Sequence, residues 1–160
     1  MIYFSEMFRK SNGKPIQHKD KNIFLMDELP VAIKKEVKLK YTIVSTNSEW
    51  RQGIAIRTDG KLIFDDVQQT KKKEWIGIWE DISLWDDVFT CYSKNGILDV
   101  KNIWDTGNGV IESWTNGAAM WYEEIPNGRR YHCNDGHFDD DFDDIVFEIM
   151  IIPNNSTVQK

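Results

Sequence analysis

The chain has 160 residues, of which 41% are hydrophobic and 29% are charged, so it can bury one sizeable core and has no room for a second domain. Its formal net charge is -6, which repels phosphate backbones and anionic lipid surfaces and argues against nucleic acid and membranes as partners. Two cysteines, Cys91 and Cys133, are too few for a disulfide-stapled secreted scaffold, and we expect both to be buried thiols.

The sequence predicts a single domain over residues 1–160, with a core from about 22 to 152 and a frayed tail over 153–160. The segment from Met1 to Met7 has neither the basic start nor the apolar stretch of a secretion signal, and no apolar run reaches membrane-spanning length. These features predict a cytoplasmic protein.

A helix is expected near the start of the core, from Asp27 to Glu36. Asp27 is suited to cap it, and Pro30 is tolerated in a first turn. From Glu36 to Val44 apolar and polar side chains alternate, and this period of two predicts a half-buried strand.

Two dipeptides, Asp59-Gly60 and Asn95-Gly96, have the chemistry of two-residue turns, because both residue types tolerate positive φ. Each therefore predicts a hairpin between the β-favouring runs on either side of it. The four strands that these turns would join are 53–57, 61–64, 88–92 and 97–100.

Further turn signals divide the second half of the chain into short strands. Turns at 107–109 and at Asn116-Gly117 bracket a segment over 110–114, and a turn at 126–128 separates 120–122 from 129–133. The last strand, from Ile145 to Ile152, is apolar on both faces apart from Glu148, which predicts a central place in its sheet. The whole pattern predicts an all-β, antiparallel β-sandwich of jelly-roll type, with nine or ten strands and at most one or two short helices.

The stretch from Asp135 to Asp144 holds six carboxylates in ten residues and precedes the last strand. Such a density of hard oxygen ligands suits Ca²⁺ better than Zn²⁺, although a solvated acidic loop is the competing interpretation. An EF-hand is excluded, because Asp144 would occupy its glycine position and Met150 its bidentate glutamate position. In an extended segment Asp139, Asp141 and Asp143 would share one side, with Asp140 and Asp144 on the other; these residues and Asp135 are the candidate ligands.

The run from Asp141 to Ile149 resembles the Asp-rich closing strand of certain secreted bacterial β-sandwich domains, often attached to adhesins and carbohydrate-active proteins. In those domains such aspartates are linked with calcium. The resemblance covers about ten residues and implies Asp141, Asp143 and Asp144 as calcium ligands.

Seven tryptophans are many for a chain of this length. Sugar rings stack their apolar C–H faces on indole while nearby amides and carboxylates bond the hydroxyls, so tryptophan beside Asn, Asp or Gly at strand ends suits a carbohydrate-binding face. The opposing interpretation is that tryptophan fills a small β core. The preferred pair is Trp114 and Trp121, which flank Asn116; Trp75 and Trp79 share one face of a strand with Gly77, opposite Ile76 and Ile78.

Catalytic and transition-metal alternatives have weaker support. The group His132, Cys133, Asp135 and His137 lacks the paired spacing of a zinc site. Either cysteine can be paired on paper with His137 as a nucleophile, and a glycosidase needs only two carboxylates, for which Glu112, Glu123 and Glu124 are conceivable. Glycoside hydrolysis is thus the least unlikely activity of a chain without a catalytic motif.

Two functions remain open. The first is a non-enzymatic, lectin-like carbohydrate-binding module with a Ca²⁺-ordered acidic loop. The second is a cytosolic acidic inhibitor, such as an immunity or phage anti-defence protein, that binds a basic protein partner through acidic loops and exposed aromatic side chains.

Overall fold

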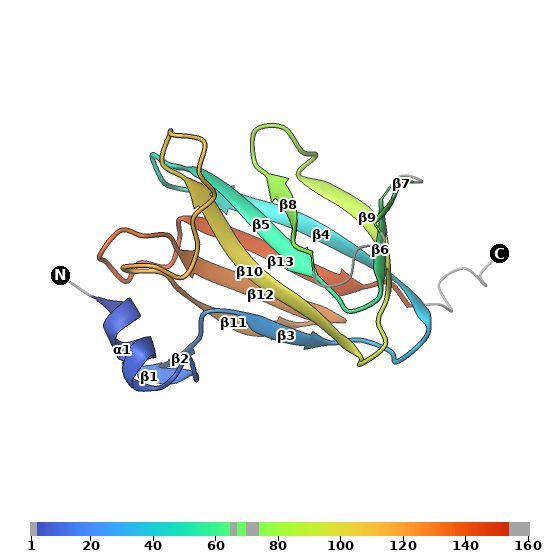
Figure 1. Ribbon diagram of the computed structural model, residues 1–160, viewed down its shortest axis with the longest axis horizontal. Helices are drawn as coiled ribbons and strands as arrows, with labels where there is room; N and C mark the ends of the chain where they lie inside the picture. The colour runs from blue at the N-terminus through green and yellow to red at the C-terminus, as the bar shows by residue number, and fades with distance from the viewer. Residues whose placement is uncertain (1–2, 65–66, 70–73, 154–160) are drawn as a thin grey trace.

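A computed structural model describes residues 3–64, 67–69 and 74–153 and shows antiparallel sheets packed against each other (Figure 1). The predicted all-β, antiparallel sandwich is therefore confirmed. No described helix is long and apolar enough to cross a membrane. Residues 154–160, most of the tail expected to be frayed, lie outside the described residues.

The larger sheet has seven strands and the smaller has four. In order across the larger sheet they are β11 (Ala119–Ile125), β12 (Gly128–Asn134), β13 (Ile145–Ile151), β4 (Glu36–Thr46), β9 (Asp86–Tyr92), β6 (Lys61–Phe64) and β7 (Val67–Gln69). In the smaller sheet they are β3 (Asp27–Pro30), β10 (Ile97–Asp105), β5 (Arg51–Arg57) and β8 (Ile76–Trp79). The predicted central position of the last strand is confirmed, because β13 lies between β12 and β4.

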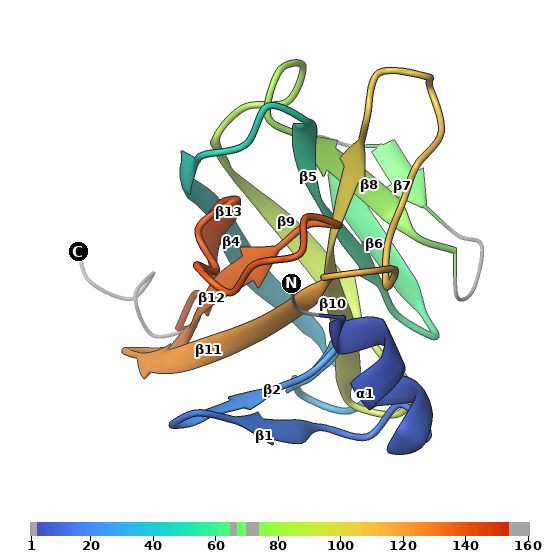
Figure 2. The ribbon, with the colours of Figure 1, turned by 90° about the vertical axis from the view of Figure 1, so that its left-hand side faces the viewer.

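The N-terminal segment folds into a helix, α1 (Phe4–Lys10), and a hairpin of β1 (Ile16–His18) and β2 (Lys21–Ile23). Figure 2 shows this segment on one side of the sandwich, below β11. An isolated antiparallel bridge between Phe24 and Met120 holds it there. The strands exceed the nine or ten expected because three-residue strands such as β1, β2 and β7 are too short to show an alternating pattern.

The helix predicted from Asp27 to Glu36 is wrong, because Asp27 begins strand β3. Asp27 and Leu29 are buried while Glu28 and Pro30 are exposed, the alternation of an edge strand. The Asp27 side chain accepts hydrogen bonds from Arg129 and Tyr131 and caps no helix. The backbone ladder with β10 and the Asp27 contacts with β12, neither of which a local pattern can show, favour a strand here.

Neither predicted Asx-Gly hairpin forms, because the strands on the two sides of each turn belong to different sheets. Instead the two turns pack together: the Asp59 carboxylate accepts a hydrogen bond from the Lys94 N–H (2.7 Å), and Gly60 lies against the Tyr92 carbonyl. From β3 to β11 the chain passes repeatedly between the sheets, so turn chemistry predicts a reversal but not the partner of the next strand. The segment over 110–114 is a loop with one bridge, between Glu112 and Trp104.

Apolar side chains from both sheets form the main core. The alternation predicted for β4 is confirmed, because Leu39, Tyr41 and Ile43 are buried. A second cluster around Phe4, Phe8, Ile23, Ala119 and Phe142 attaches the N-terminal segment. The acidic loop before β13 is therefore packed through Phe142 against the start of the chain.

Candidate functional site

The acidic loop, residues 135–144, connects β12 to β13 and is held by Asn134. The Asn134 side chain accepts a hydrogen bond from the Phe142 N–H (2.7 Å) and donates one to the Asp139 carbonyl (2.7 Å). Its own carbonyl accepts one from the Asn102 side chain in the opposite sheet (2.9 Å). Phe142 is buried with a φ of 52°, so the loop turns sharply there and is not extended.

Because of that turn, the expected division of the aspartates is wrong for Asp144. Asp139, Asp141 and Asp144 each place a carboxylate oxygen within 4.8 Å of the other two. The Oδ1 atoms of Asp139 and Asp143 are buried and have no hydrogen-bond partner among the described residues. Converging carboxylates with unpartnered buried oxygens fit a divalent cation, so this part of the loop is a candidate metal centre.

The ionisation of these carboxyl groups reflects their crowding. Desolvation raises the pKa of Asp141 to about 6, and the neighbouring Asp139 and Asp143 carboxylates add to the shift. Burial raises the pKa of Asp144 to about 8, although the hydrogen bond that Asp144 accepts from the Asp135 backbone N–H lowers this pKa. A bound cation would offset this repulsion and favour the charged forms.

Asp135 is fully buried at the inner end of the loop. It accepts hydrogen bonds from Ser48 (2.6 Å) and Gln52 (2.9 Å), and His137 Nδ1 lies 2.7 Å from its other oxygen. Together with His137 and Asp144 it forms a second group of potential ligands. Its position is already fixed by these partners, so Asp135 supports the loop as well as offering a ligand atom.

Asp140 lies apart from the cluster. Its carboxylate contacts His18 Nε2 (3.0 Å) and Lys19 Nζ (2.8 Å) on the N-terminal hairpin. Both partners lower the pKa of Asp140. The loop thus uses one of its aspartates to hold the N-terminal segment rather than to enter the candidate metal centre.

Trp75 and Trp79 lie on the outer face of the smaller sheet and pack with Ala55 and Ile103. As the alternation predicts, Ile76 and Ile78 face the main core instead. Each tryptophan is covered by an arginine of β5: Arg57 lies 4.2 Å from the Trp75 ring and Arg51 lies 4.1 Å from the Trp79 ring. These rings already stack on side chains of the protein itself.

Lys101 lies between Trp75 and Trp114, with its Nζ 4.2 Å and 4.3 Å from the two ring centroids. It donates a hydrogen bond to Ser113 (3.1 Å). Burial lowers the pKa of Lys101 to about 8, and the Arg57 charge contributes. Lys101 therefore fastens the loop that carries Trp114 onto the smaller sheet.

The two tryptophans preferred from the sequence, Trp114 and Trp121, have different surroundings. Trp121 stacks on His132 at 4.2 Å and is covered by Lys21, both from neighbouring strands. Trp114 is 41% exposed and donates a hydrogen bond from its indole nitrogen to the Leu25 carbonyl (3.1 Å). Asn116 is an exposed turn residue with a φ of 54° whose carbonyl accepts the Ser5 N–H.

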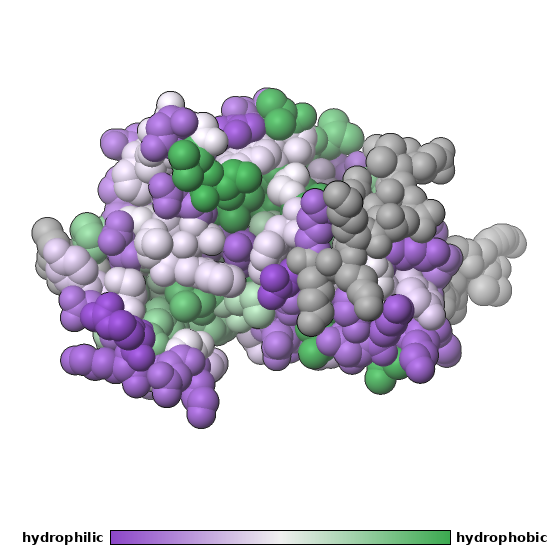
Figure 3. Space-filling view, viewed as in Figure 1, coloured by the Kyte–Doolittle hydropathy of each residue, from purple (hydrophilic) through white to green (hydrophobic). Residues whose placement is uncertain are grey.

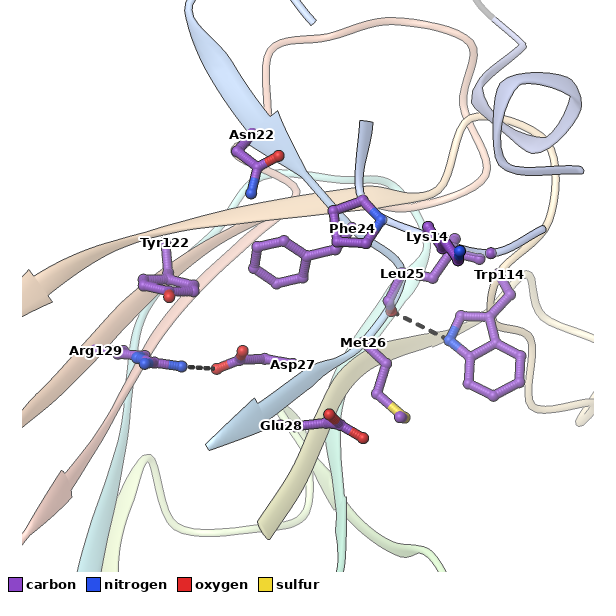
Figure 4. Close-up of a pocket in the computed structure, with 12 residues that line it drawn as sticks. Lys14, Asn22, Phe24, Leu25, Met26, Asp27, Glu28, Trp114, Tyr122 and Arg129 are labelled. Carbon is purple, nitrogen blue, oxygen red and sulfur yellow. Dashed lines mark hydrogen bonds and ion pairs between the residues drawn. The ribbon is translucent and has the colours of Figure 1, made fainter. Parts of the chain in front are cut away.

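Trp114 borders an open pocket of about 650 Å³ between the N-terminal segment and the two sheets (Figure 4). Tyr122 and Phe24 face Trp114 from the other side, with their rings 5.5 Å apart. Apolar surface is visible in the hollow beside the hydrophilic N-terminal segment (Figure 3). The pocket is lined by Gly13, Lys14, Pro15, Asn22, Phe24, Leu25, Met26, Asp27, Glu28, Trp114, Tyr122 and Arg129.

The polar side chains of the pocket are of two kinds. Asp27 and Arg129 pair at 2.8 Å, and the Arg129 guanidinium lies 4.2 Å from the Tyr122 ring, so these groups are fixed. The side chains of Lys14, Asn22 and Glu28 make no hydrogen bond or ion pair with any described residue. Three unpaired polar groups and three aromatic rings thus surround one cavity. Sequence reasoning selected only Trp114 of this set, because the other members come from segments that show no common motif.

The catalytic alternatives gain no support from these positions. Both cysteines are buried, and burial raises the pKa of Cys91 to about 11 and that of Cys133 well above its usual range, which disfavours the thiolate. Glu123 contacts His132 and Arg130, and Glu124 contacts Arg129. The Glu123 pairs lie on the face of β11 and β12 away from the main core, and the Glu124–Arg129 contact lies on the other face, beside the pocket.

No family model matches the chain, and no curated protein matches it. Among solved structures, its fold is similar to that of the Chromobacterium violaceum lectin CV2L, a structure in complex with alpha-methyl-fucoside. The sequence identity is 14%, the match covers 79% of this chain and 95% of the lectin chain, and the TM-score is 0.40.

Proposed function

We propose that this protein is a non-enzymatic carbohydrate-binding module. The observation that carries the proposal is the pocket beside Trp114, which combines aromatic rings with polar side chains that have no partner in the described residues. Its volume of about 650 Å³ lies within the range of roughly 300–1,000 Å³ typical of small-molecule sites. A sugar ring packs its C–H face on an indole or phenol ring while Asn22 and Glu28 bond its hydroxyls.

A calcium-ordered acidic loop is part of the proposal. Asp139, Asp141 and Asp144 would hold the ion through their converging carboxylate oxygens, with Asp143, whose charge lies beside Asp141, as a further ligand. The unpartnered buried oxygens of Asp139 and Asp143 support this choice. The resemblance to the Asp-rich closing strand of calcium-linked β-sandwich domains supports the choice of metal. Calcium bound there stabilises the loop, on which the segment carrying Trp114 rests.

A glycan array probed with the purified chain tests the proposal. We expect binding to a defined set of glycans in the presence of Ca²⁺. Trp114→Ala should lower the affinity at least about tenfold, because it removes the exposed indole of the pocket. Trp121→Ala is the matched control: it removes an indole that stacks on His132 outside the pocket, and it should leave binding unchanged. An array without hits would overturn the proposal.

A protein partner is the second candidate, as expected for a cytosolic inhibitor. It is favoured by exposed apolar side chains after β8 and β10. Figure 3 shows hydrophobic side chains at that end of the molecule. The residues are Ile82, Leu84, Trp85, Val110 and Ile111, which are 74%, 66%, 42%, 51% and 63% exposed. Capture of one specific basic protein by the immobilised chain, lost with Leu84→Ser, would support this candidate.

A further inference from the structure

A second, smaller cavity of about 210 Å³ adjoins the pocket along β3. Met26 and Glu28 line both cavities, and Figure 4 shows them projecting next to each other. The second cavity continues to Arg57, Asp59 and Asp99, at the start of β10 and the end of β5. Its volume falls below the roughly 300 Å³ of a typical independent site, so it is better suited to extend the larger pocket than to bind a ligand alone.

We infer that the two cavities form one extended groove for a neutral oligosaccharide chain of several sugar units. The inference rests on the proposed carbohydrate-binding function and specifies its ligand. One unit would stack in the pocket beside Trp114, and the chain would pass Glu28 so that its next units reach Asp99. A protein built for a single terminal sugar would need no cavity beyond Glu28.

The charges of the groove favour a neutral chain. In the pocket Asp27 is paired with Arg129, and in the second cavity Asp99 is paired with Arg57 at 2.8 Å. The Asp59 carboxylate is occupied by the backbone N–H of Lys94, which contributes to its lowered pKa. Groups of both signs line the whole groove, with Lys14, Arg57 and Arg129 among Asp27, Glu28, Asp59 and Asp99, so a polyanion would meet carboxylates and a polycation would meet cationic side chains along the same path.

Glu28 has the central role in this arrangement. Its backbone is fixed in the ladder with β10, opposite Asp99, while its side chain is exposed and unpaired within the described residues. It can therefore accept hydrogen bonds from hydroxyls on either side. The Asp99–Arg57 pair offers an acceptor and donors to the unit beyond it.

Calorimetric titration with a ladder of neutral oligosaccharides of one to six units, built from glucose, mannose or N-acetylglucosamine, tests the inference. For the backbone that binds, affinity should rise at least about tenfold from one unit to four and then level off. Asp99→Asn should lower the affinity for the longer chains about fivefold and leave that for the single sugar within about twofold, whereas Trp114→Ala should weaken every member of the ladder.

Other results distinguish failure of the inference from failure of the proposed function. If a single sugar binds as tightly as the six-unit chain and Asp99→Asn has no effect, the extended groove is wrong and carbohydrate binding stands. Tighter binding of polyuronic acids than of neutral chains would also overturn the groove as described. If no sugar binds, both proposals fail. Thermal melting of each variant verifies that it is folded, and the dependence of wild-type affinity on chain length provides the second test should Asp99→Asn unfold.

Discussion

Gly117 lies against the backbone carbonyl of His137, so closely that a Cβ added to the glycine would be 1.9 Å from that oxygen. The Gly117 N–H also donates a hydrogen bond to the Gly136 carbonyl (3.4 Å). Through this contact the segment that carries Trp114 rests directly on the acidic loop. The candidate metal centre and the candidate sugar pocket are therefore connected by a backbone contact that only glycine permits.

Gly117→Ala is expected to destabilise the protein by more than about 2 kcal/mol, because backbone atoms must move to admit the methyl group. Denaturant unfolding measures the change. Gly77→Ala is the matched control, since its Cβ would meet only side-chain atoms, the nearest at 3.3 Å, and should cost less than about 1 kcal/mol. Equal losses in the two variants would mean that the Gly117 contact is not tight in solution.

Asp141→Asn is expected to raise the melting temperature of the metal-free protein, because it removes a carboxyl group whose pKa is raised by desolvation and by the neighbouring Asp139 and Asp143 carboxylates. The same change should abolish the rise in melting temperature that Ca²⁺ produces in the wild type. Asp140→Asn is the control in the same loop: Asp140 contacts His18 and Lys19, so the Ca²⁺ response should persist. A wild type whose melting does not respond to Ca²⁺ or to a chelator would identify the loop as a solvated acidic surface.

The sequence was informative where structure is set by local alternation. The period of two in β4 and the doubly apolar run of β13 predicted both strands and the central place of β13. The turn residues Asp59 and Asn95 predicted reversals correctly but the strand pairing wrongly, because the choice of sheet depends on contacts far along the chain. Helix α1 was missed for a similar reason, as Phe4 and Phe8 are buried by Phe142 and its neighbours rather than by a local pattern.

The candidate sites were predictable to different degrees. The acidic loop is contiguous, so its aspartates could be named from the sequence. The positive φ of Phe142, which brings Asp144 beside Asp139, could not be predicted from the spacing of these residues. The pocket is assembled from separate segments of the chain, and only Trp114 stood out. Glu28 and Asn22 belong to no recognisable motif, so only their position in the pocket identifies them as candidate site residues.

The buried Lys101 predicts a pH dependence of stability. Its pKa falls from 10.5 in the unfolded chain to about 8 in the folded protein. Between these values the unfolded chain binds more protons, so the free energy of unfolding should rise with pH, by at most about 1.4 kcal/mol per pH unit. Below pH 8 both states are protonated and this contribution is flat.

Lys101→Met lacks the titrating group and isolates its effect. Denaturant unfolding of the wild type and the variant, compared from pH 7 to pH 10, should show the wild type gaining stability relative to the variant above about pH 8. Parallel curves would show that the Lys101 ammonium is not desolvated between Trp75 and Trp114.

Asp27→Asn should destabilise the protein by about 3 kcal/mol, because it leaves the Arg129 charge without its buried partner and weakens the hydrogen bond from Tyr131. The control is Glu124→Gln, which removes the other carboxylate near Arg129. Glu124 is 69% exposed and 3.5 Å away, so the loss should be below about 0.5 kcal/mol. Denaturant unfolding measures the free energy of unfolding of both variants. Similar decreases in the two variants would contradict a fixed Asp27–Arg129 pair.

The most direct test of carbohydrate binding in the pocket follows the tryptophan indole N–H signals in a ¹H–¹⁵N spectrum during titration with the strongest glycan from the array. The Trp114 signal, identified by its absence in Trp114→Phe, should shift in proportion to saturation, because its indole N–H bonds the Leu25 carbonyl at the edge of the pocket. The signals of Trp104, which is buried in β10, and of Trp121 should stay in place. A titration in which Trp114 is silent while another indole moves, such as that of Trp50 beside His137, would contradict the pocket as the sugar site.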